Sequence, residues 1–249
     1  MTVFVSHQQD VYRTTPDAWQ TQIWARGVRR AGRHWVISRH VKRYCQPLTV
    51  EGSARLAGVK GPVLIIPNHA SHFDTPVALS VLPERIRGKT ALAAAADRFY
   101  RHDKRGWWYS LYFNAFPIER LGGGSATLEY PLSLLKRGWS VLIYPEGTRT
   151  RTGELGSFHH GVALMAMKAN VPVIPIYSEG LREIMPPGQR SPRPAAVHVR
   201  IGAPVWLDGA ASIPDGTALL ERAMRALAGE PLREAGEASR EREMMEAGR

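Results

Sequence analysis

The sequence predicts an α/β fold, in which a single domain has a mixed β-sheet layered by helices and follows a basic amphipathic N-terminal helical segment. Short apolar segments bounded by Gly, Pro or Asn alternate with longer segments of helical period. Such alternation is typical of a sheet covered by helices. The 249 residues are 44% hydrophobic, which is enough for one sizeable core.

The N-terminal part of the chain divides into a polar start and a basic helix. Residues 1–16 show no apolar pattern, so no regular structure is expected there. We expect a helix over residues 17–44. Apolar side chains, among them Trp19, Trp24 and Trp35, recur there at roughly helical spacing, and arginines and lysines lie between them. We therefore separate an N-terminal helical region, residues 1–45, from an α/β domain, residues 46–228.

Within that domain, Gly61-Pro62 introduces a short apolar strand, and Gly138 closes a helix after Lys136 and Arg137. Thr90–Ala96 fits either a strand or a helix, and the prolines of residues 171–177 predict an edge or irregular strand. Residues 181–195, with four prolines, are expected to form a loop, and residues 229–249 a charged tail. The other expected strands are 63–67, 115–118, 141–144 and 197–201, and the other expected helices are 75–81, 106–113, 125–136, 158–169 and 217–228.

The charge of the chain indicates an anionic partner. The net charge is +11, and residues 1–45 hold eight Arg or Lys side chains and two Asp, a net charge of +6. Tryptophan and arginine on an amphipathic helix are typical of a helix that lies on an anionic membrane surface. An ordinary helix with a solvated basic face is the alternative. No recognised nucleic-acid motif is present, so nucleic acid is not expected as a partner.

Two further features bear on where the protein works. No apolar stretch approaches the ~20 residues that a bilayer-spanning helix needs, and no signal peptide opens the chain. Cys45 is the single cysteine, which excludes an internal disulfide and a cysteine-based zinc site and agrees with a reducing compartment. We expect a peripheral protein on the cytoplasmic face of a membrane, without a metal.

A His-x4-Asp pair follows the predicted strand 63–67. In Asn68–Asp74, His69 and Asp74 diverge on a regular helix but meet if His69 lies in the turn before the helix. A carboxylate on one ring nitrogen fixes the tautomer and leaves the other nitrogen free to take a proton. Alone the pair is a weak signal, since Asp74 also suits a helix N-cap, and His72 is interpreted as a bystander.

A second motif ends the predicted strand 141–144. It reads Tyr144-Pro145-Glu146-Gly147-Thr148-Arg149, in which Gly147 permits an unusual backbone conformation and Arg149 can grip a phosphate with two donors. By itself this motif would also suit a surface turn.

Together these motifs resemble the glycerolipid acyltransferase family of the 1-acylglycerol-3-phosphate (PlsC-like) type. Asn68–Asp74 is similar to its Asn-His-x-Ser-x-x-Asp block, Phe116–Arg120 to its second block, Tyr144–Gly153 to its third and Val173–Ile176 to its fourth. All four occur in the family's order between about residues 60 and 180.

The resemblance implies an activity and a role for each matched residue. His69 would be the general base and Asp74 its orienting partner. The donor would be an acyl thioester, acyl-CoA or acyl-carrier protein, and the acceptor a lysolipid, most simply 1-acylglycerol-3-phosphate, with no cofactor. The acceptor site would comprise Arg120, Glu146, Gly147, Thr148 and Arg149.

One departure from the family pattern keeps other acceptors open. The family usually has Phe-Lys-x-Gly after its third block, whereas this chain has Phe158-His159-His160-Gly161, and Asp97-Arg98 stands near the place of another common lysine. Loss of a permanent positive charge favours a non-phosphate acceptor such as a lyso-aminolipid as the alternative. A non-catalytic lipid-binding protein of the same fold is the alternative from another class.

Overall fold

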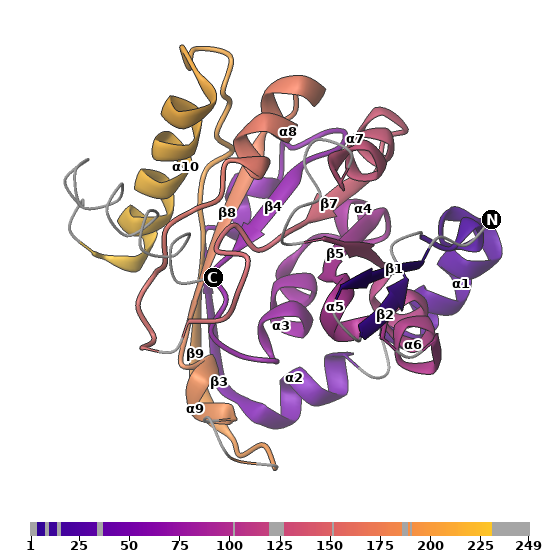
Figure 1. Ribbon diagram of the computed structural model, residues 1–249. Coiled ribbons are helices and arrows are strands. Elements are labelled where there is room, and N and C mark those ends of the chain that lie inside the picture. The colour runs from indigo at the N-terminus through magenta and orange to yellow at the C-terminus, as the bar shows by residue number, and fades with distance from the viewer. Residues whose placement is uncertain are drawn as a thin grey trace.

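A seven-stranded mixed β-sheet runs through the centre of the computed structural model (Figure 1). The structure describes residues 4–7, 10–13, 16–33, 37–101, 103–119, 127–150, 152–185, 189 and 191–230. The strands lie in the order β3-β9-β8-β4-β7-β5-β6. Their bounds are β3 Cys45–Glu51, β4 Leu64–Pro67, β5 Thr90–Ala95, β6 Ala115–Ile118, β7 Ser140–Leu142, β8 Val173–Glu179 and β9 Ala195–Ile201.

Five neighbouring strands are parallel, and the order in which the chain visits them creates a switch point at β4. Strands β8, β4, β7, β5 and β6 run the same way, whereas β9 is antiparallel to β8 and parallel to β3. The chain moves outward from β4 to β5 and β6, returns to insert β7 beside β4, and then crosses to β8. The carboxyl ends of β4, β5, β6 and β7 therefore meet at one edge, where α/β sheets commonly bind ligands.

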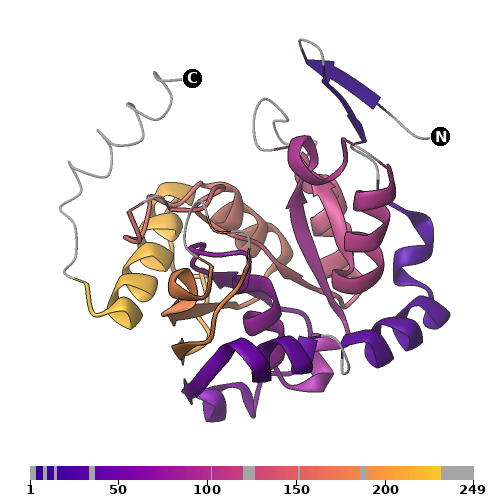
Figure 2. The ribbon, with the colours of Figure 1, turned by 90° about the horizontal axis from the view of Figure 1, so that it is seen from below.

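Helices cover both faces of the sheet (Figures 1 and 2). On one face Ile65 of β4 packs with α2 (Ser38–Tyr44), α3 (Asp74–Val81) and α9 (Leu181–Ile184). On the other face Leu64 and Ile66 pack with α7 (Glu129–Lys136), α8 (Gly161–Ala169) and α10 (Ile213–Ala228). Every residue of β4 is buried, because alternate side chains enter the two cores. The predicted α/β fold class is thereby confirmed.

The N-terminal region differs from its prediction in two ways. β1 (Phe4–His7) and β2 (Asp10–Arg13) pair as an antiparallel hairpin, so the expectation of no regular structure there was wrong. Val5, Val11 and Tyr12 favour strands, but strands of four residues are too short to show a recognisable pattern in the sequence. The single expected helix is instead a 3₁₀ turn, η1 (Ala18–Thr21), followed by α1 (Ile23–Gly32) and α2.

The division into two helices has a packing reason. α1 packs against α6 (Asp103–Phe113) near the β6 edge, whereas α2 packs through Val41 onto the core beside α3. One straight helix cannot follow both surfaces. Trp35 lies outside the described residues, and so does the predicted charged tail 229–249 from residue 231 onward.

Several strand predictions are settled by the sheet. Thr90–Ala95 is a strand, and short helices α4 (Glu84–Arg87) and α5 (Ala96–Phe99) flank it. An edge or irregular strand was expected at residues 171–177; β8 is interior, so the edge alternative was wrong. The carbonyl of Pro175 accepts from Gly202 N, which places the polar backbone groups of Pro175 on the side of β9. The paired residues of β8 and β9 begin only at Ile176, so the N–H group that proline lacks is not needed for the ladder. Residues 181–195, expected to be a loop, begin with α9.

Candidate active site

The turn after β4 is held to the neighbouring strand β8 by Asn68. Its buried amide nitrogen donates to the carbonyl of Ser178 at 3.0 Å, and its amide oxygen accepts from Ser178 N at 2.8 Å. Only an amide side chain offers a donor and an acceptor in this arrangement. Asn68 therefore fixes where the chain leaves β4 and where His69 begins.

His69 and Asp74 meet, as the sequence predicts. His69 Nδ1 lies 2.8 Å from Asp74 Oδ2, and the same oxygen accepts from Ala70 N at 2.7 Å and Ser71 N at 2.8 Å. Because two backbone N–H groups already donate to this oxygen, it is unprotonated and the third partner, Nδ1, is the donor. Nε2 of a neutral His69 then carries the lone pair of a general base.

Asp74 is 2% exposed and begins α3. Burial raises the pKa of its carboxyl group, and the hydrogen bonds from His69, Ser71 and Ala70 act in the opposite direction.

The Tyr144 ring stacks on the imidazole of His69, with 3.9 Å between ring centroids and 20° between ring planes. The Tyr144 hydroxyl is 2.6 Å from Thr75 Oγ1, so the stacking ring is itself fixed to α3.

Glu146 lies behind His69 rather than on the wall of a cavity. It is 4% exposed, and its two oxygens accept from His69 N at 2.8 Å and from Gly156 N at 3.0 Å. Burial raises the pKa of Glu146 from 4.5 to about 7, against the effect of these two N–H donors. The carboxyl group thus joins the turn after β4 to the loop that follows β7.

Arg149 reaches the same turn from that loop. Its Nη1 donates to Nε2 of His72 at 2.9 Å. Burial, followed by repulsion from Arg149 and Arg98, lowers the pKa of His72 from 6.5 to about 4, so this imidazole stays neutral as an acceptor at physiological pH. His72, interpreted from sequence as a bystander, therefore contacts one of the residues assigned to the acceptor.

A cavity of about 680 Å³ opens beside His69. Its lining includes the apolar side chains of Leu92, Phe99, Phe113, Ile118 and Val162, and also Gly147, Thr148, Arg149, His72, Arg98, Glu119 and His159. The strands β4, β5, β6 and β7 all contribute to it at or near their carboxyl ends. The cavity therefore combines a histidine paired with a carboxylate, positively charged side chains and apolar side chains.

The structure brings most of the predicted site residues together. His69, Gly147, Thr148 and Arg149 line the cavity, and Asp74 and Glu146 support His69 from behind. Gly147 has φ +67°, and a Cβ there would lie 2.8 Å from the His159 ring, which explains the need for glycine. Arg120 lies outside the described residues.

Two residues were missed by sequence reasoning. The stacking of Tyr144 on His69 had no local signal, because 75 positions separate the two residues. Arg98 was noted only for its place in the chain, although it follows β5 at the same sheet edge as His69. Among the described residues, no group of three His, Cys, Asp or Glu side chains could hold a metal ion.

The fold and the site define an α/β protein with a His–Asp pair beside a cavity at the carboxyl ends of the parallel strands. The chain belongs to the acyltransferase family, whose model matches residues 33–179. The chloroplastic 1-acyl-sn-glycerol-3-phosphate acyltransferase of Arabidopsis thaliana is 33% identical over 57% of this chain and 38% of its own length. The lyso-ornithine lipid O-acyltransferase of Pseudomonas aeruginosa is 28% identical over 59% of this chain and 54% of its own length.

A solved structure shares the fold. The 1-acyl-sn-glycerophosphate acyltransferase PlsC of Thermotoga maritima superposes with a TM-score of 0.62 at 23% identity, covering 84% of this chain and 81% of that one. The chain spans well under half the length of the Arabidopsis thaliana relative.

Proposed function

We propose that this protein transfers a fatty acyl group from an acyl thioester to the hydroxyl of a lysophospholipid. The observation that carries the proposal is the His69–Asp74 pair beside a cavity of about 680 Å³ that apolar side chains also line. A thioester is already activated, so the reaction needs a base, positioning and an apolar site for the chain. The family to which the chain belongs supports the same chemistry.

The proposed step is general-base catalysis. Nε2 of His69 takes the proton of the acceptor hydroxyl as its oxygen attacks the thioester carbonyl carbon. Asp74 stabilises the imidazolium that forms, because Nδ1–H already donates to Oδ2 at 2.8 Å. The tetrahedral intermediate then breaks its carbon–sulfur bond, and the leaving thiolate takes the proton from His69. The products are an ester and a free thiol.

The acceptor we propose is 1-acylglycerol-3-phosphate. Arg98 and Arg149 carry permanent positive charge in the lining of the cavity, and Arg149 presents a forked donor that suits a phosphate. A lyso-aminolipid is the second candidate, because Glu119 and His159 also line the cavity and a carboxylate suits an ammonium group. One relative is named a lyso-ornithine lipid O-acyltransferase.

Mass spectrometry of products decides both the reaction and the acceptor. The purified protein is given one acyl-CoA and an equimolar pool of lysophosphatidic acid and lyso-ornithine lipid, while thiol release is followed in parallel. Phosphatidic acid as the main product supports the first candidate, and acylated ornithine lipid supports the second. No thiol release with either acyl-CoA or acyl-carrier protein as donor would leave a non-catalytic lipid-binding protein.

We also propose that the protein lies on the surface of an anionic membrane. Six side chains of η1, α1 and α6 form what we call the aromatic patch: Trp19, Ile23, Trp24, Val28, Trp107 and Trp108. Trp19 joins its two halves, with ring centroids 5.6 Å from Trp24 and 6.2 Å from Trp107. Tryptophans with nearby arginines suit the headgroup layer of a bilayer. Within the described part of the chain, no helix is long and apolar enough to cross a membrane.

Vesicle sedimentation tests this surface with a matched control. Trp24 and Trp108 of the aromatic patch are 54% and 51% exposed, and Trp206, elsewhere on the molecule, is 51% exposed. We expect Trp24→Ser with Trp108→Ser to weaken binding to vesicles that contain phosphatidylglycerol, whereas Trp206→Ser leaves it unchanged. Equal losses from both proteins would show that the patch has no special role.

A further inference from the structure

A second cavity, of about 740 Å³, lies beneath α1 at the end of the sheet opposite His69. Its wall comes from α1, from α4 and from the turn that leads into β5. Arg33 shows that this cavity lies at the amino end of β5, because it donates to the carbonyls of Arg87 and of Thr90, the first residue of β5. The cavity beside His69 lies instead at the carboxyl ends of the strands, so the two sites are separate.

The wall of this second cavity is strongly cationic. It carries seven basic side chains, namely Arg26, Arg29, Arg30, Arg33, Arg85, Arg87 and Lys89. Among the residues described there, Glu84 is the one carboxylate, and it already lies 2.8 Å from Arg87 and 3.7 Å from Arg30. In this lining the basic side chains therefore outnumber the carboxylate seven to one, an arrangement that costs free energy unless an anion is present.

Hydrogen bonds to the backbone hold some of these arginines, but the guanidinium of Arg29 is only partly hydrogen-bonded. Arg33 donates to three backbone carbonyls and joins α1 to α6 and β5. Arg29 is 3% exposed and donates to the carbonyl of Gln20 through Nη2, but its Nη1 is buried with no hydrogen-bond partner among the described residues. Burial, followed by repulsion from Arg26, lowers the pKa of Arg29 to about 10. A buried donor without a partner points to a missing acceptor.

One strongly exposed apolar side chain lines the cavity. Ile23 is 83% exposed, and Trp24, the next residue in the chain, belongs to the aromatic patch. Gly27 also lines the cavity, and a Cβ built there would meet no atom within 4 Å. The site therefore has room beside α1, several cations and an exposed isoleucine.

We propose that this cavity binds the phosphate of an anionic lipid headgroup, with the Arg29 guanidinium as its inner donor and Ile23 and Trp24 against the lipid's apolar part. Phosphate oxygens suit the forked donors of arginine, and one charge-assisted hydrogen bond changes affinity by about tenfold or more. The lipid source is favoured over free phosphate because Ile23, which lines the cavity, belongs to the surface proposed to meet the membrane.

The test places a carboxylate inside the cavity without removing any arginine. Gly27→Glu adds an intramolecular anion, and Gly27→Gln is its uncharged match of the same size. Thermal unfolding of both full-length variants and of the wild type is followed with dihexanoylphosphatidylglycerol, with inorganic phosphate and with dihexanoylphosphatidylcholine, at constant ionic strength. General salt stabilisation cancels in the comparison between the two variants.

We expect the phosphatidylglycerol to raise the unfolding temperature of the wild type and Gly27→Gln, with an apparent affinity at least about tenfold weaker for Gly27→Glu. Without ligand, Gly27→Glu should unfold at a higher temperature than Gly27→Gln. The same difference with inorganic phosphate supports a phosphate site that needs no lipid tail. Equal responses of the two variants to both anions would overturn the proposal, and a response to inorganic phosphate alone would overturn the lipid assignment.

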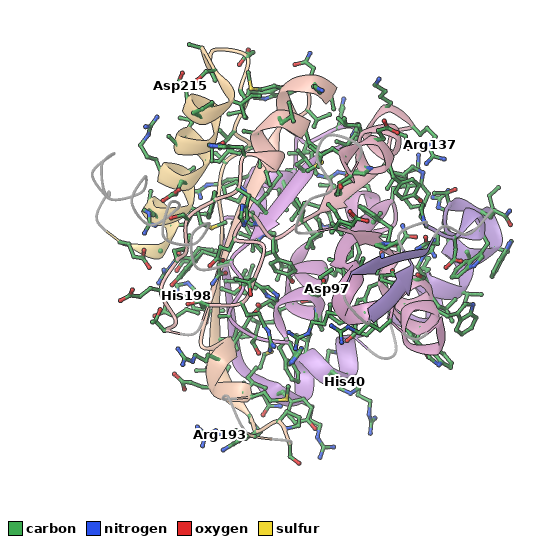
Figure 3. All side chains as sticks on the ribbon, in the orientation of Figure 1. His40, Asp97, Arg137, Arg193, His198 and Asp215 are labelled. Carbon is green, nitrogen blue, oxygen red and sulfur yellow. The ribbon has the colours of Figure 1, made fainter. Side chains whose placement is uncertain are left out.

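Two further variants separate the site from overall charge. Arg29→Met removes the inner donor, and Arg193→Gln removes one positive charge from an exposed position far from α1 (Figure 3). The response to phosphatidylglycerol should be lost in Arg29→Met and kept in Arg193→Gln. Equal losses in these two variants would mean that net charge alone attracts the anion.

Discussion

Glu146→Gln is the substitution that tests most sharply how the site is held. Both carboxyl oxygens of Glu146 accept backbone hydrogen bonds, from His69 N and from Gly156 N. A glutamine keeps one acceptor but turns an NH₂ group toward the other N–H. The backbone of His69 or of Gly156 must then move. A displacement of about 1 Å in a catalytic group lowers rate by roughly 10²-fold, so we expect that loss in kcat.

The acceptor KM should change little in this variant, because Glu146 does not line the cavity whereas Arg149 does. Initial rates of thiol release with varied lysolipid give kcat and KM separately. Glu154→Gln is the matched control, since it removes an exposed carboxylate from the same loop. A rise in KM with kcat unchanged would refute the positioning role and place Glu146 against the acceptor, as the family resemblance implies.

The pH dependence of stability offers an independent readout of the same residue. The pKa of Glu146 is raised from 4.5 to about 7 by burial, so the folded protein binds more protons than the unfolded chain between these values. Stability from this group is therefore complete below about pH 4.5 and is lost as the pH rises through about 7, a change of roughly 3 kcal/mol. The difference in unfolding free energy between wild type and Glu146→Gln isolates it, and a difference that is flat across this window would contradict the assignment.

Four other substitutions test neighbouring parts of the site. His69→Ala should lower kcat by ~10²–10⁴-fold with an unchanged circular dichroism spectrum. Near-normal turnover would contradict the assignment of His69 as the general base. Asp74→Asn should also impair kcat severely, because an amide cannot stabilise the imidazolium; a pH–rate profile would show it. Arg149→Lys should raise the acceptor KM about tenfold and leave the donor KM unchanged, in substrate titrations. Gly147→Ala should lower the unfolding temperature, since φ is +67° and the new Cβ would lie 2.8 Å from His159.

The strands that sequence reasoning found are the buried ones. β4 was predictable because all of its residues are buried and Gly61-Pro62 precedes it. β3 was missed because it is a sheet edge with mostly exposed side chains, so it has neither a continuous apolar run nor a regular alternation. Pro175 misled the prediction for β8, since only the finished sheet shows that its missing N–H faces no ladder bond.

The same limit applies to the site. His69 and Asp74 lie close in the sequence, so their contact could be predicted from local spacing. In the structure His69 Nδ1 lies 2.8 Å from Asp74 Oδ2. The link from Arg149 to His72 spans 77 positions, and the partners of Glu146 are backbone N–H groups that no residue type reveals. Sequence motifs thus identified which residues gather at the site, and the topology decides which of them touch one another.

That topology explains why His69 and Arg149 are placed together. β7 lies beside β4 because the chain returns from β6 to fill the gap between β4 and β5. His69 is then bound on both sides of its backbone, since its N–H donates to Glu146 and its carbonyl accepts from Thr150 N at 2.8 Å. Arg149 immediately precedes Thr150, so His69 and this arginine form one connected unit. Their separation is set by backbone hydrogen bonds. Under the function we propose, this spacing must match the distance between the hydroxyl and the anionic group of the acceptor.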